Sequence, residues 1–487
     1  IYQGKHRLAI QRGKINMLFN SYEFIVLFLP ITFFVYFYLA KKKLITASRV
    51  WLLLTSLFFY SWWNVAYLPI ILCSMVFNYL VGTLIGDVDK KGFNKKLLLS
   101  FGVVSNLALL IYYKYADFLI DNLNYAADLQ VQSLNLLLPL AISFFTFQQI
   151  AYLVDSYRLK TQRHDFLGYA VFVSFFPQLI AGPIVHHSEM MPQFSDQKNS
   201  FINHRNVLLG ICIFTIGLFK KVVVADNFAI WANHGFDAAQ SLTFVEAWAT
   251  SLSFTFQLYY DFSGYTDMAT GLALLFNIKL PQNFNSPYQS LSIQDFWRRW
   301  HMTLSRFLKD YVYIPLGGNR NGGLRTYCNL IATFLIGGLW HGAGWMFVIW
   351  GLLHGISLAL HRIWNALGFR LYKWVAWIVT FNFINVTWVF FRAENMSDAN
   401  KVLSSMFLID GPINLIGLST FGDIDAKQFY LIIILVLGII FSIPLRNSNQ
   451  LLIKFEPTIS KITVIVAVLL TAVLGLSQDS IFLYFNF

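Results

Sequence analysis

Charged residues are scarce in this chain of 487 residues, because Asp, Glu, Lys and Arg together make up only 12% of it. Soluble globular domains carry roughly 25% charged residues, so the composition excludes a water-soluble enzyme. Hydrophobic residues make up 57%, and at about 20 apolar residues per membrane-spanning helix the length allows on the order of ten spans. We therefore expect an all-α, polytopic membrane protein of about ten or more transmembrane helices.

Cysteine and several common catalytic signatures are also rare or absent. Cys73, Cys212 and Cys328 stand alone without a CxxC spacing, so neither a disulfide framework nor a thiolate zinc site is expected. The sequence has no GxSxG, HExxH, GxxxxGK[ST] or Rossmann fingerprint, which removes support for serine hydrolase, zincin, P-loop and dinucleotide-binding functions. No metal site and no permanently bound cofactor are expected.

Acidic residues are outnumbered by basic ones, 24 against 36, which gives a formal charge of +12. In a membrane protein such an excess indicates basic cytoplasmic loops, so lipid is the expected partner and nucleic acid is not. Basic clusters at Lys41–Lys43, 87–96 and 157–164 are each separated by two apolar runs. The clusters should therefore share the cytoplasmic side.

The organisation along the chain indicates one domain. Residues 1–16 are polar and basic before Met17, and we expect them to be a non-native or disordered leader, with a single integral-membrane domain over 17–487. The polar, glycine-containing segment 395–427 is the best candidate for a longer extramembrane loop. Apolar runs are expected as helices at 22–40, 50–67, 68–86, 97–113, 134–154, 167–185, 207–225, 244–260, 266–280, 328–339, 345–361, 371–391, 429–443 and 462–476.

Several of these runs are too short to span a membrane. Runs of about 10 to 14 residues are more often re-entrant or interfacial, and irregular backbone at membrane depth lines a cavity or is covered by protein. The run at 167–185 is also interrupted by Pro177, Gly182 and Pro183. The middle of the chain therefore indicates a cavity.

The block 295–325 concentrates basic residues among aromatic ones, and its candidate anion-binding residues are Arg298, Arg299, Arg306 and Lys309. Apolar residues recur there near helical spacing, which is typical of an amphipathic helix in the membrane interface. One interpretation is a membrane-surface anchor. The other is an anion site, because guanidinium groups match phosphate oxygens, and a cytoplasmic acyl-CoA carries such phosphates.

Three histidines are candidates for chemistry. His341 and His354 lie in the apolar stretch 337–355, where an ionisable group is costly enough to suggest a function; the alternative is a hydrogen bond between helices. His301 lies within the basic block. Asp261 is a further candidate between apolar runs, with a helix cap or an interhelical contact as the structural alternative.

The segments FFPQLIAGPIVH, YDFSGYTDMATGLALLFNIKLPQNFNSPY, DFWRRWHMTLSRFLKDYVYIPLGGNR and GGLWHGAGW follow one another within the core 175–355. With them the chain resembles the membrane-bound O-acyltransferases, in the bacterial branch typified by the membrane subunit of alginate O-acetyltransferase. The resemblance implies that His341 and His301 are the two family histidines, and that Trp340 belongs to the motif. It also implies a multi-helix fold with a funnel that meets the histidine.

This resemblance implies acyl transfer, usually of acetyl, from a cytoplasmic thioester such as acetyl-CoA to a hydroxyl acceptor. The expected acceptor is an extracytoplasmic polysaccharide, such as alginate, another exopolysaccharide or a cell-wall glycan, reached through an extracytoplasmic partner protein. The expected location is the bacterial inner membrane. A neutral imidazole accelerates such a transfer as general base by roughly 100- to 10,000-fold, but the residues do not decide which histidine is the base.

Two other classes remain open at this level. A polytopic transporter or flippase for an envelope precursor would also contain broken helices and buried polar groups. A noncatalytic scaffold of an envelope complex is the third interpretation. Turnover of an acyl-CoA thioester would distinguish the enzyme from both.

Overall fold

A computed structural model describes residues 17–87, 94–159, 165–409, 438, 447–453, 455–476 and 482–483. The predicted leader 1–16, the basic residues 88–93 and 160–164, the loop residues 410–427 and most of the apolar run 429–443 lie outside the described residues. Within them every regular element is a helix, as the composition predicts.

The first half of the chain forms the following helices, with π-helical segments labelled η: η1 (Glu23–Phe28), α2 (Leu29–Lys41), α3 (Ile45–Trp63), α4 (Leu68–Gly86), α5 (Lys95–Leu110), η3 (Ile111–Tyr115), α6 (Ala116–Ala127), α7 (Ile142–Tyr157), α8 (Phe166–Ser174), α9 (Phe176–Leu179), α10 (His187–Ser195), α11 (His204–Phe219), η5 (Lys220–Ala225) and α12 (Asp226–Asn233). The second half forms η6 (His234–Ala238), α13 (Phe244–Leu275), α14 (Ile293–Trp297), α15 (Met302–Leu308), η8 (Lys309–Tyr313), α16 (Gly322–His341), α17 (Trp345–Ala366), α18 (Lys373–Arg392), α19 (Met396–Met406), α21 (Ser448–Ile453) and α22 (Ile459–Leu474).

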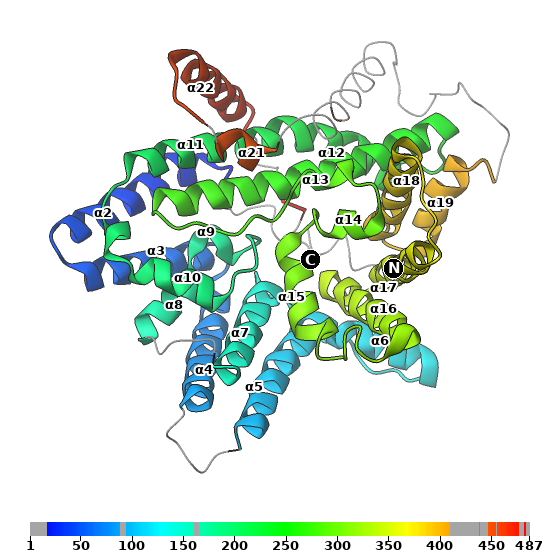
Figure 1. The fold of residues 1–487 in the computed structure, drawn as a ribbon, viewed down its shortest axis with the longest axis horizontal. Coiled ribbons are helices and arrows are strands. Elements are labelled where there is room, and N and C mark those ends of the chain that lie inside the picture. Colours follow the sequence, from blue (N-terminus) through cyan, green and yellow to red (C-terminus); the bar gives the residue numbers. More distant parts are fainter. Residues whose placement is uncertain are drawn as a thin grey trace.

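Helix α13 runs through the centre of the molecule, beside α11 and α12 and with α14 and α15 near its other side (Figure 1). Its 32 residues are almost all buried, and its start is fixed by a capping box in which Thr243 and Glu246 satisfy each other's backbone N–H groups. The two apolar runs predicted at 244–260 and 266–280 are therefore wrong as separate helices. The polar residues between them do not interrupt the helix.

Glycines allow α11 and α13 to pack at backbone contact. A Cβ atom built on Gly217 would lie 2.5 Å from the carbonyl oxygen of Gly264, and one built on Gly271 would lie 2.5 Å from that of Gly210. Small residues at helix crossings provide this close approach in membrane proteins. The crossing fixes α13, whose Phe262 ring contacts His301.

We expect Gly217→Ala to lower the thermal stability of the purified protein, because the added methyl group forces the two backbones apart at a cost of about 1 to 3 kcal/mol. Gly86→Ala is the matched control, since nothing lies within 4 Å of its Cβ position. Thermal unfolding in detergent measures both. Equal melting temperatures for Gly217→Ala and the wild type would contradict this packing.

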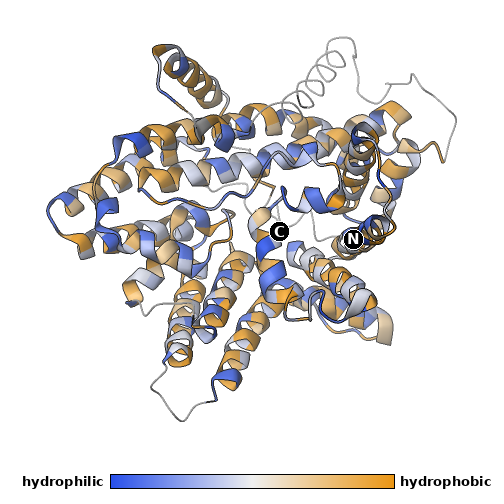
Figure 2. Ribbon diagram, viewed as in Figure 1, coloured by the Kyte–Doolittle hydropathy of each residue, from blue (hydrophilic) through white to orange (hydrophobic). Residues whose placement is uncertain are grey.

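The outer surface is apolar, as a lipid-facing surface requires. Six helical stretches in the described residues are long and apolar enough to cross a membrane: Glu23–Lys41, Val65–Gly86, Lys95–Ala127, His204–Ala238, Trp345–Ala366 and Lys373–Arg392. Phe34 and Val104 on two of them are 66% and 62% exposed. Figure 2 shows hydrophobic colour along the peripheral helix α22, whereas α15 in the middle carries hydrophilic colour. The chain is thus a multi-pass membrane protein, and about ten spans in total remains a prediction.

Several predicted boundaries agree with the helices and others do not. The run 68–86 coincides with α4, and the interrupted run 167–185 is divided into α8 and α9 by a break at Phe175. The run 134–154 becomes helical only at Ile142. The expected amphipathic helix in the block 295–325 is wrong in outline, because α14 and α15 are short helices separated by residues 298–301.

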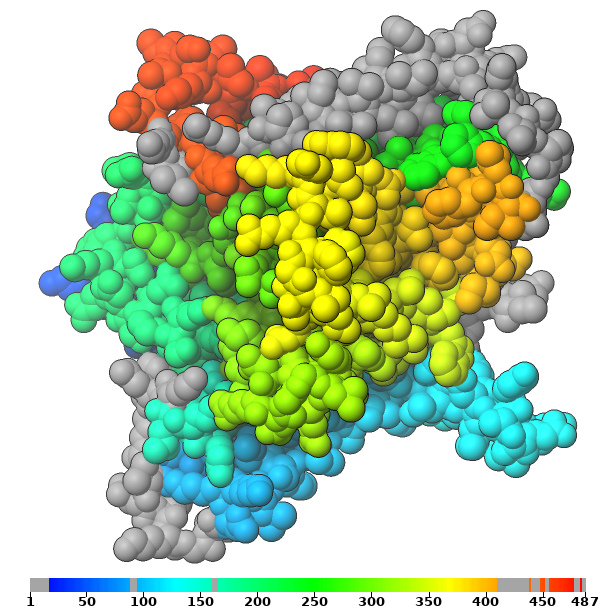
Figure 3. Space-filling view, turned by 45° about the vertical axis from the view of Figure 1, so that its right-hand side comes forward, coloured from blue at the N-terminus to red at the C-terminus, as the bar shows by residue number. Residues whose placement is uncertain are grey.

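The predicted cytoplasmic clusters are separated by pairs of helices, α3 with α4 and then α5–α6 with α7. The continuous helical stretch from Lys95 to Ala127 has 33 residues, which corresponds to about 50 Å and exceeds the roughly 30 Å of a bilayer core. Its far end, α6, protrudes from the molecule at the lower right of Figure 3. Tyr125, which is 94% exposed, should therefore lie on the opposite side from Lys95.

In a cysteine-free background, we expect Tyr125→Cys to react with an impermeant thiol reagent on intact cells. Lys43→Cys, at an exposed position just after the end of α2, should react only after permeabilisation, because basic clusters remain in the cytoplasm. Labelling of Lys43→Cys from outside would reverse the topology.

Candidate active site

His301 occupies a sharp reversal of the chain between α14 and α15. Its backbone has a φ of 40° in the left-handed region, and its side chain is 0% exposed. The ring nitrogen Nδ1 lies 3.0 Å from Oδ1 of Asn283, and the ring packs edge-on against Phe262 of α13 at 4.8 Å between centroids. A buried side chain held in a strained left-handed turn is typical of a functional position.

His341 is the last residue of α16 and is 2% exposed. The helix ends there because Gly342 is extended and begins the short turn to α17. The imidazole packs against three aromatic side chains, Trp340, Trp350 and Phe391, at centroid separations of 4.9, 5.2 and 5.1 Å. The surroundings exclude water and disfavour the charged form of the ring.

The two histidine rings lie together, with their centroids 6.5 Å apart. The Trp340 ring is near both, 6.0 Å from His301 and 4.9 Å from His341. Residues that are 40 positions apart in the sequence thus meet in one buried place. One reacting group between the rings would contact both, so the arrangement suits proton transfer coupled to orientation of a substrate.

His354 is buried as well, but its contacts join two helices and support a neighbouring ring. Its Nδ1 accepts a hydrogen bond of 3.2 Å from Nε1 of Trp297, and its ring lies 4.7 Å from that of Trp350. The bond ties α17 to α14. His354 therefore supports Trp350, which in turn packs on His341.

Lys114 is a residue that the motif analysis did not single out. It lies in η3, and its Nζ donates to the backbone oxygens of Trp340 at 2.6 Å and His341 at 3.3 Å and to Oγ of Ser143 at 3.1 Å. The last carbonyls of a helix lack internal partners and attract cations. Lys114 thus fixes the end of α16 that carries His341. A lysine directly after the apolar run 97–113 was the available signal.

Asp261 lies in the middle of α13, and its carboxylate forms an ion pair of 2.7 Å with Lys221 of η5. Asp267, two turns further, pairs with Lys220 at 2.7 Å. Both carboxylates are thus compensated by neighbouring lysines of one segment. The ion pair with Lys221 is an interhelical contact, which is the structural alternative that the sequence offered for Asp261. These contacts do not bring Asp261 to the histidines.

The four predicted cationic residues are not arranged as an open cluster. Arg299 pairs with Asp295 at 2.9 Å, Arg306 forms a two-pronged ion pair with Glu189, and the Lys309 side chain is 67% exposed. Arg298 is exposed. Lys309 also pairs with Asp310 at 3.9 Å. A phosphate would have to exchange with carboxylates at three of these positions, so anion binding by this block stays a prediction.

No group of His, Cys, Asp and Glu side chains in the described part of the chain is arranged to hold a metal ion. The titratable side chains that the site brings together are the imidazoles of His301 and His341. Fold and site together define a multi-pass membrane protein with a buried histidine pair at its centre.

Comparison with known proteins gives the family. The sequence profile of MBOAT, the membrane-bound O-acyltransferase family, matches residues 50–396. The chain is 50% identical over 522 aligned residues to a peptidoglycan O-acetyltransferase of Helicobacter pylori, with 97% of this chain and 98% of that relative covered. It is 42% identical to a "probable alginate O-acetylase AlgI" of Pseudomonas aeruginosa, with 80% and 75% covered. It is 27% identical to a teichoic acid D-alanyltransferase of Bacillus subtilis, with 51% and 67% covered.

The chain belongs to the membrane-bound O-acyltransferase family, and its similarity to O-acetylating relatives makes it an O-acetyltransferase. The predicted family, the all-α membrane fold and the enzyme class are confirmed. The transporter and scaffold interpretations are not supported, because the matching family and these relatives are acyltransferases.

Proposed function

We propose that this chain O-acetylates peptidoglycan, taking acetyl from a cytoplasmic acyl-CoA and transferring it across the bacterial inner membrane. The observation that carries this acceptor is the 50% identity over 97% of the chain and 98% of a peptidoglycan O-acetyltransferase. Alginate is the second candidate, supported by 42% identity over 80% of the chain. Both polymers offer hydroxyl groups on an extracytoplasmic glycan.

The reaction follows from the histidine pair. An acceptor hydroxyl oxygen attacks the thioester carbonyl carbon, the C–S bond breaks, and the hydroxyl proton passes to His341 and then to the departing thiolate, which leaves as the thiol. His301, with its ring centroid 6.5 Å from that of His341, either orients the acceptor or donates to the developing oxyanion. Lys114 contributes by holding the end of α16.

A partner protein completes the proposal. The described residues are almost entirely helices of the membrane core, whereas peptidoglycan and alginate are polymers outside the membrane. We therefore propose that an extracytoplasmic protein receives the acetyl group and delivers it to the polymer. The thioester donor, membrane lipid and this acceptor protein are then the partners of the chain.

The acceptor is tested by deletion of the gene in its source bacterium, followed by mass spectrometry of muropeptides and of secreted polysaccharide. We expect O-acetyl groups to disappear from peptidoglycan and to return with the wild-type gene but not with His341→Gln. Unchanged muropeptides with loss of acetyl from a secreted polysaccharide would instead assign the alginate-type acceptor.

The donor site is tested by neutralising Arg298 and Arg299 together as glutamines. We expect the KM for acetyl-CoA to rise about tenfold or more with little change in acceptor use, since each charge-assisted contact is worth about 1.5 to 3 kcal/mol. Arg205→Gln, an exposed arginine on α11, is the control. An unchanged KM for acetyl-CoA in the folded double variant would contradict anion binding and favour the interpretation of the block as a membrane-surface anchor.

A further inference from the structure

The side chain of Asn283 contacts the ring of His301 at Nδ1. Its Oδ1 lies 3.0 Å from Nδ1 of His301 and accepts from Oγ1 of Thr303 at 2.8 Å and from the backbone N–H of Thr303 at 3.3 Å. The backbone N–H is only a donor, so the oxygen, and not the nitrogen, of the amide must face this cluster. The Thr303 hydroxyl in turn accepts from the N–H of Ile184, which leaves its own hydrogen for Asn283.

This orientation decides the tautomer of His301. An amide oxygen only accepts hydrogen bonds, so Nδ1 of His301 must carry the hydrogen. In the neutral ring Nε2 then has the lone pair. A neutral His301 of this tautomer accepts a proton or a hydrogen bond at Nε2 and does not donate one to an oxyanion.

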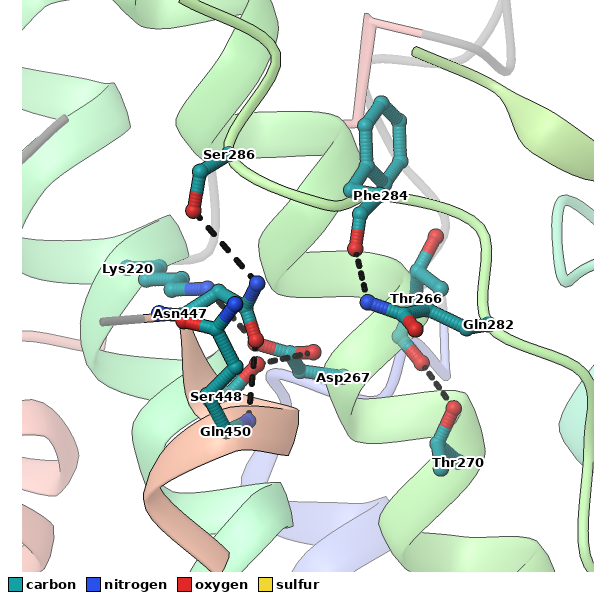
Figure 4. Close-up of polar contacts among 10 residues, drawn as sticks. All are labelled: Lys220, Thr266, Asp267, Thr270, Gln282, Phe284, Ser286, Asn447, Ser448 and Gln450. Atoms are coloured by element: carbon teal, nitrogen blue, oxygen red, sulfur yellow. Dashed lines mark hydrogen bonds and ion pairs between the residues drawn. The ribbon is translucent and has the colours of Figure 1, made fainter. Parts of the chain in front are cut away.

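Asn283 also lines a polar cavity of about 20 Å³. Asn283 Nδ2, Ser263 Oγ and Thr266 Oγ1 are buried atoms on its lining residues without a hydrogen-bond partner among the described residues. Lys220, Asp267 and Ser448 also line the cavity, and Figure 4 shows that Ser448 and Lys220 both contact the carboxylate of Asp267, at 2.8 and 2.7 Å.

A buried water needs roughly 10 to 15 Å³ and two to four polar partners. The cavity of about 20 Å³ and its three unsatisfied side chains, Asn283, Ser263 and Thr266, meet both conditions. A water there would accept from Nδ2 and so keep the amide from rotating by 180°. The cavity is too small for a thioester or a sugar.

We propose that Asn283 is a positioning residue that keeps His301 in the Nδ1–H tautomer, and that a water bound in the cavity beside Ser263 and Thr266 fixes its amide. The proposal rests on the proposed acyl transfer at His301 and His341. It assigns His301 to orientation of the acceptor, toward which Nε2 presents a hydrogen-bond-accepting lone pair, while the proton of the reacting hydroxyl goes to His341. It also predicts that the oxyanion is stabilised by other donors.

The test compares Asn283→Leu and Asn283→Asp with the wild type in acetyl transfer. We expect Asn283→Leu to lower kcat about tenfold or more, with a KM for acetyl-CoA within about twofold, because a ring without its orienting partner adopts the wrong tautomer. Asn283→Asp keeps an oxygen acceptor and should recover most of kcat. On acidification, Asn283→Asp should lose activity at a higher pH than the wild type does, because a carboxylate beside Nδ1 favours the charged, inactive form of the His301 ring.

Asn106→Leu is the matched control, because Asn106 is equally buried and forms a hydrogen-bonded pair with Asn78 on α4 and α5. It should leave the shape of the pH profile unchanged. The double variant Ser263→Ala, Thr266→Val should lower kcat about threefold or more, and an unchanged kcat would remove the water from the proposal.

Wild-type kcat and pH profile in Asn283→Leu, beside a His301→Ala protein that has lost transfer, would overturn the proposal. If Asn283→Leu does not fold, the pH profile of Asn283→Asp decides, and an unchanged profile overturns it. Full transfer by His301→Ala would instead contradict the proposed function of the histidine pair.

Discussion

Replacement of His341 by glutamine is expected to lower acetyl transfer by about 100-fold or more, while expression and stability in detergent stay near the wild-type level. Glutamine keeps a hydrogen-bonding group in the aromatic pocket but cannot take up a proton near neutral pH. Transfer from labelled acetyl-CoA in isolated membranes measures the effect.

His354→Gln is the matched control for this experiment, because His354 is also fully buried and packs on the same Trp350 ring. Its loss of the bond to Trp297 should reduce transfer only several-fold. Near-normal transfer by folded His341→Gln protein, or an equal loss in both variants, would remove the general-base role from His341.

The second large effect is expected at His301. His301→Ala should lower transfer by about 100-fold, because it removes the ring that lies beside His341 and leaves Asn283 without that partner. His301→Asn should retain partial activity, since an amide oxygen accepts a hydrogen bond from an acceptor hydroxyl but takes up no proton. Initial rates at saturating donor compare the two.

Equal and large losses of transfer in His301→Ala and His301→Asn would indicate that His301 transfers the proton itself. Equal and small losses would show that the ring only fills space. Partial activity in His301→Asn alone assigns the residue to orientation of the acceptor.

The helical membrane fold was predictable because apolar runs of sufficient length have few alternatives in a bilayer. The boundaries of α4 follow directly from the run 68–86. Polar residues within α13 were not predictable as helical, because Asp261 and Asp267 are compensated by Lys221 and Lys220, which lie 40 and 47 residues away in sequence. Such pairing depends on tertiary contacts that periodicity does not report.

The candidate site could be predicted only in part, because some of its contacts join residues that are far apart in the sequence. His341 stood out as a titratable residue in an apolar stretch, and the family motif led to the same position. Asn283 was within a quoted motif, but its contact with His301 requires a chain reversal with a left-handed residue. Lys114 acts on the end of a helix more than 200 residues away. Neither relation has a local signature.

Transfer across a sealed vesicle tests the central claim most directly. Purified protein is reconstituted with labelled acetyl-CoA enclosed on the side where Lys43 lies, and a hydroxyl acceptor is supplied only on the other side. We predict labelled ester on the outer acceptor with the wild type and about 100-fold less with His341→Gln. Equal labelling by the two proteins, or labelling only when donor and acceptor share one compartment, would contradict the account.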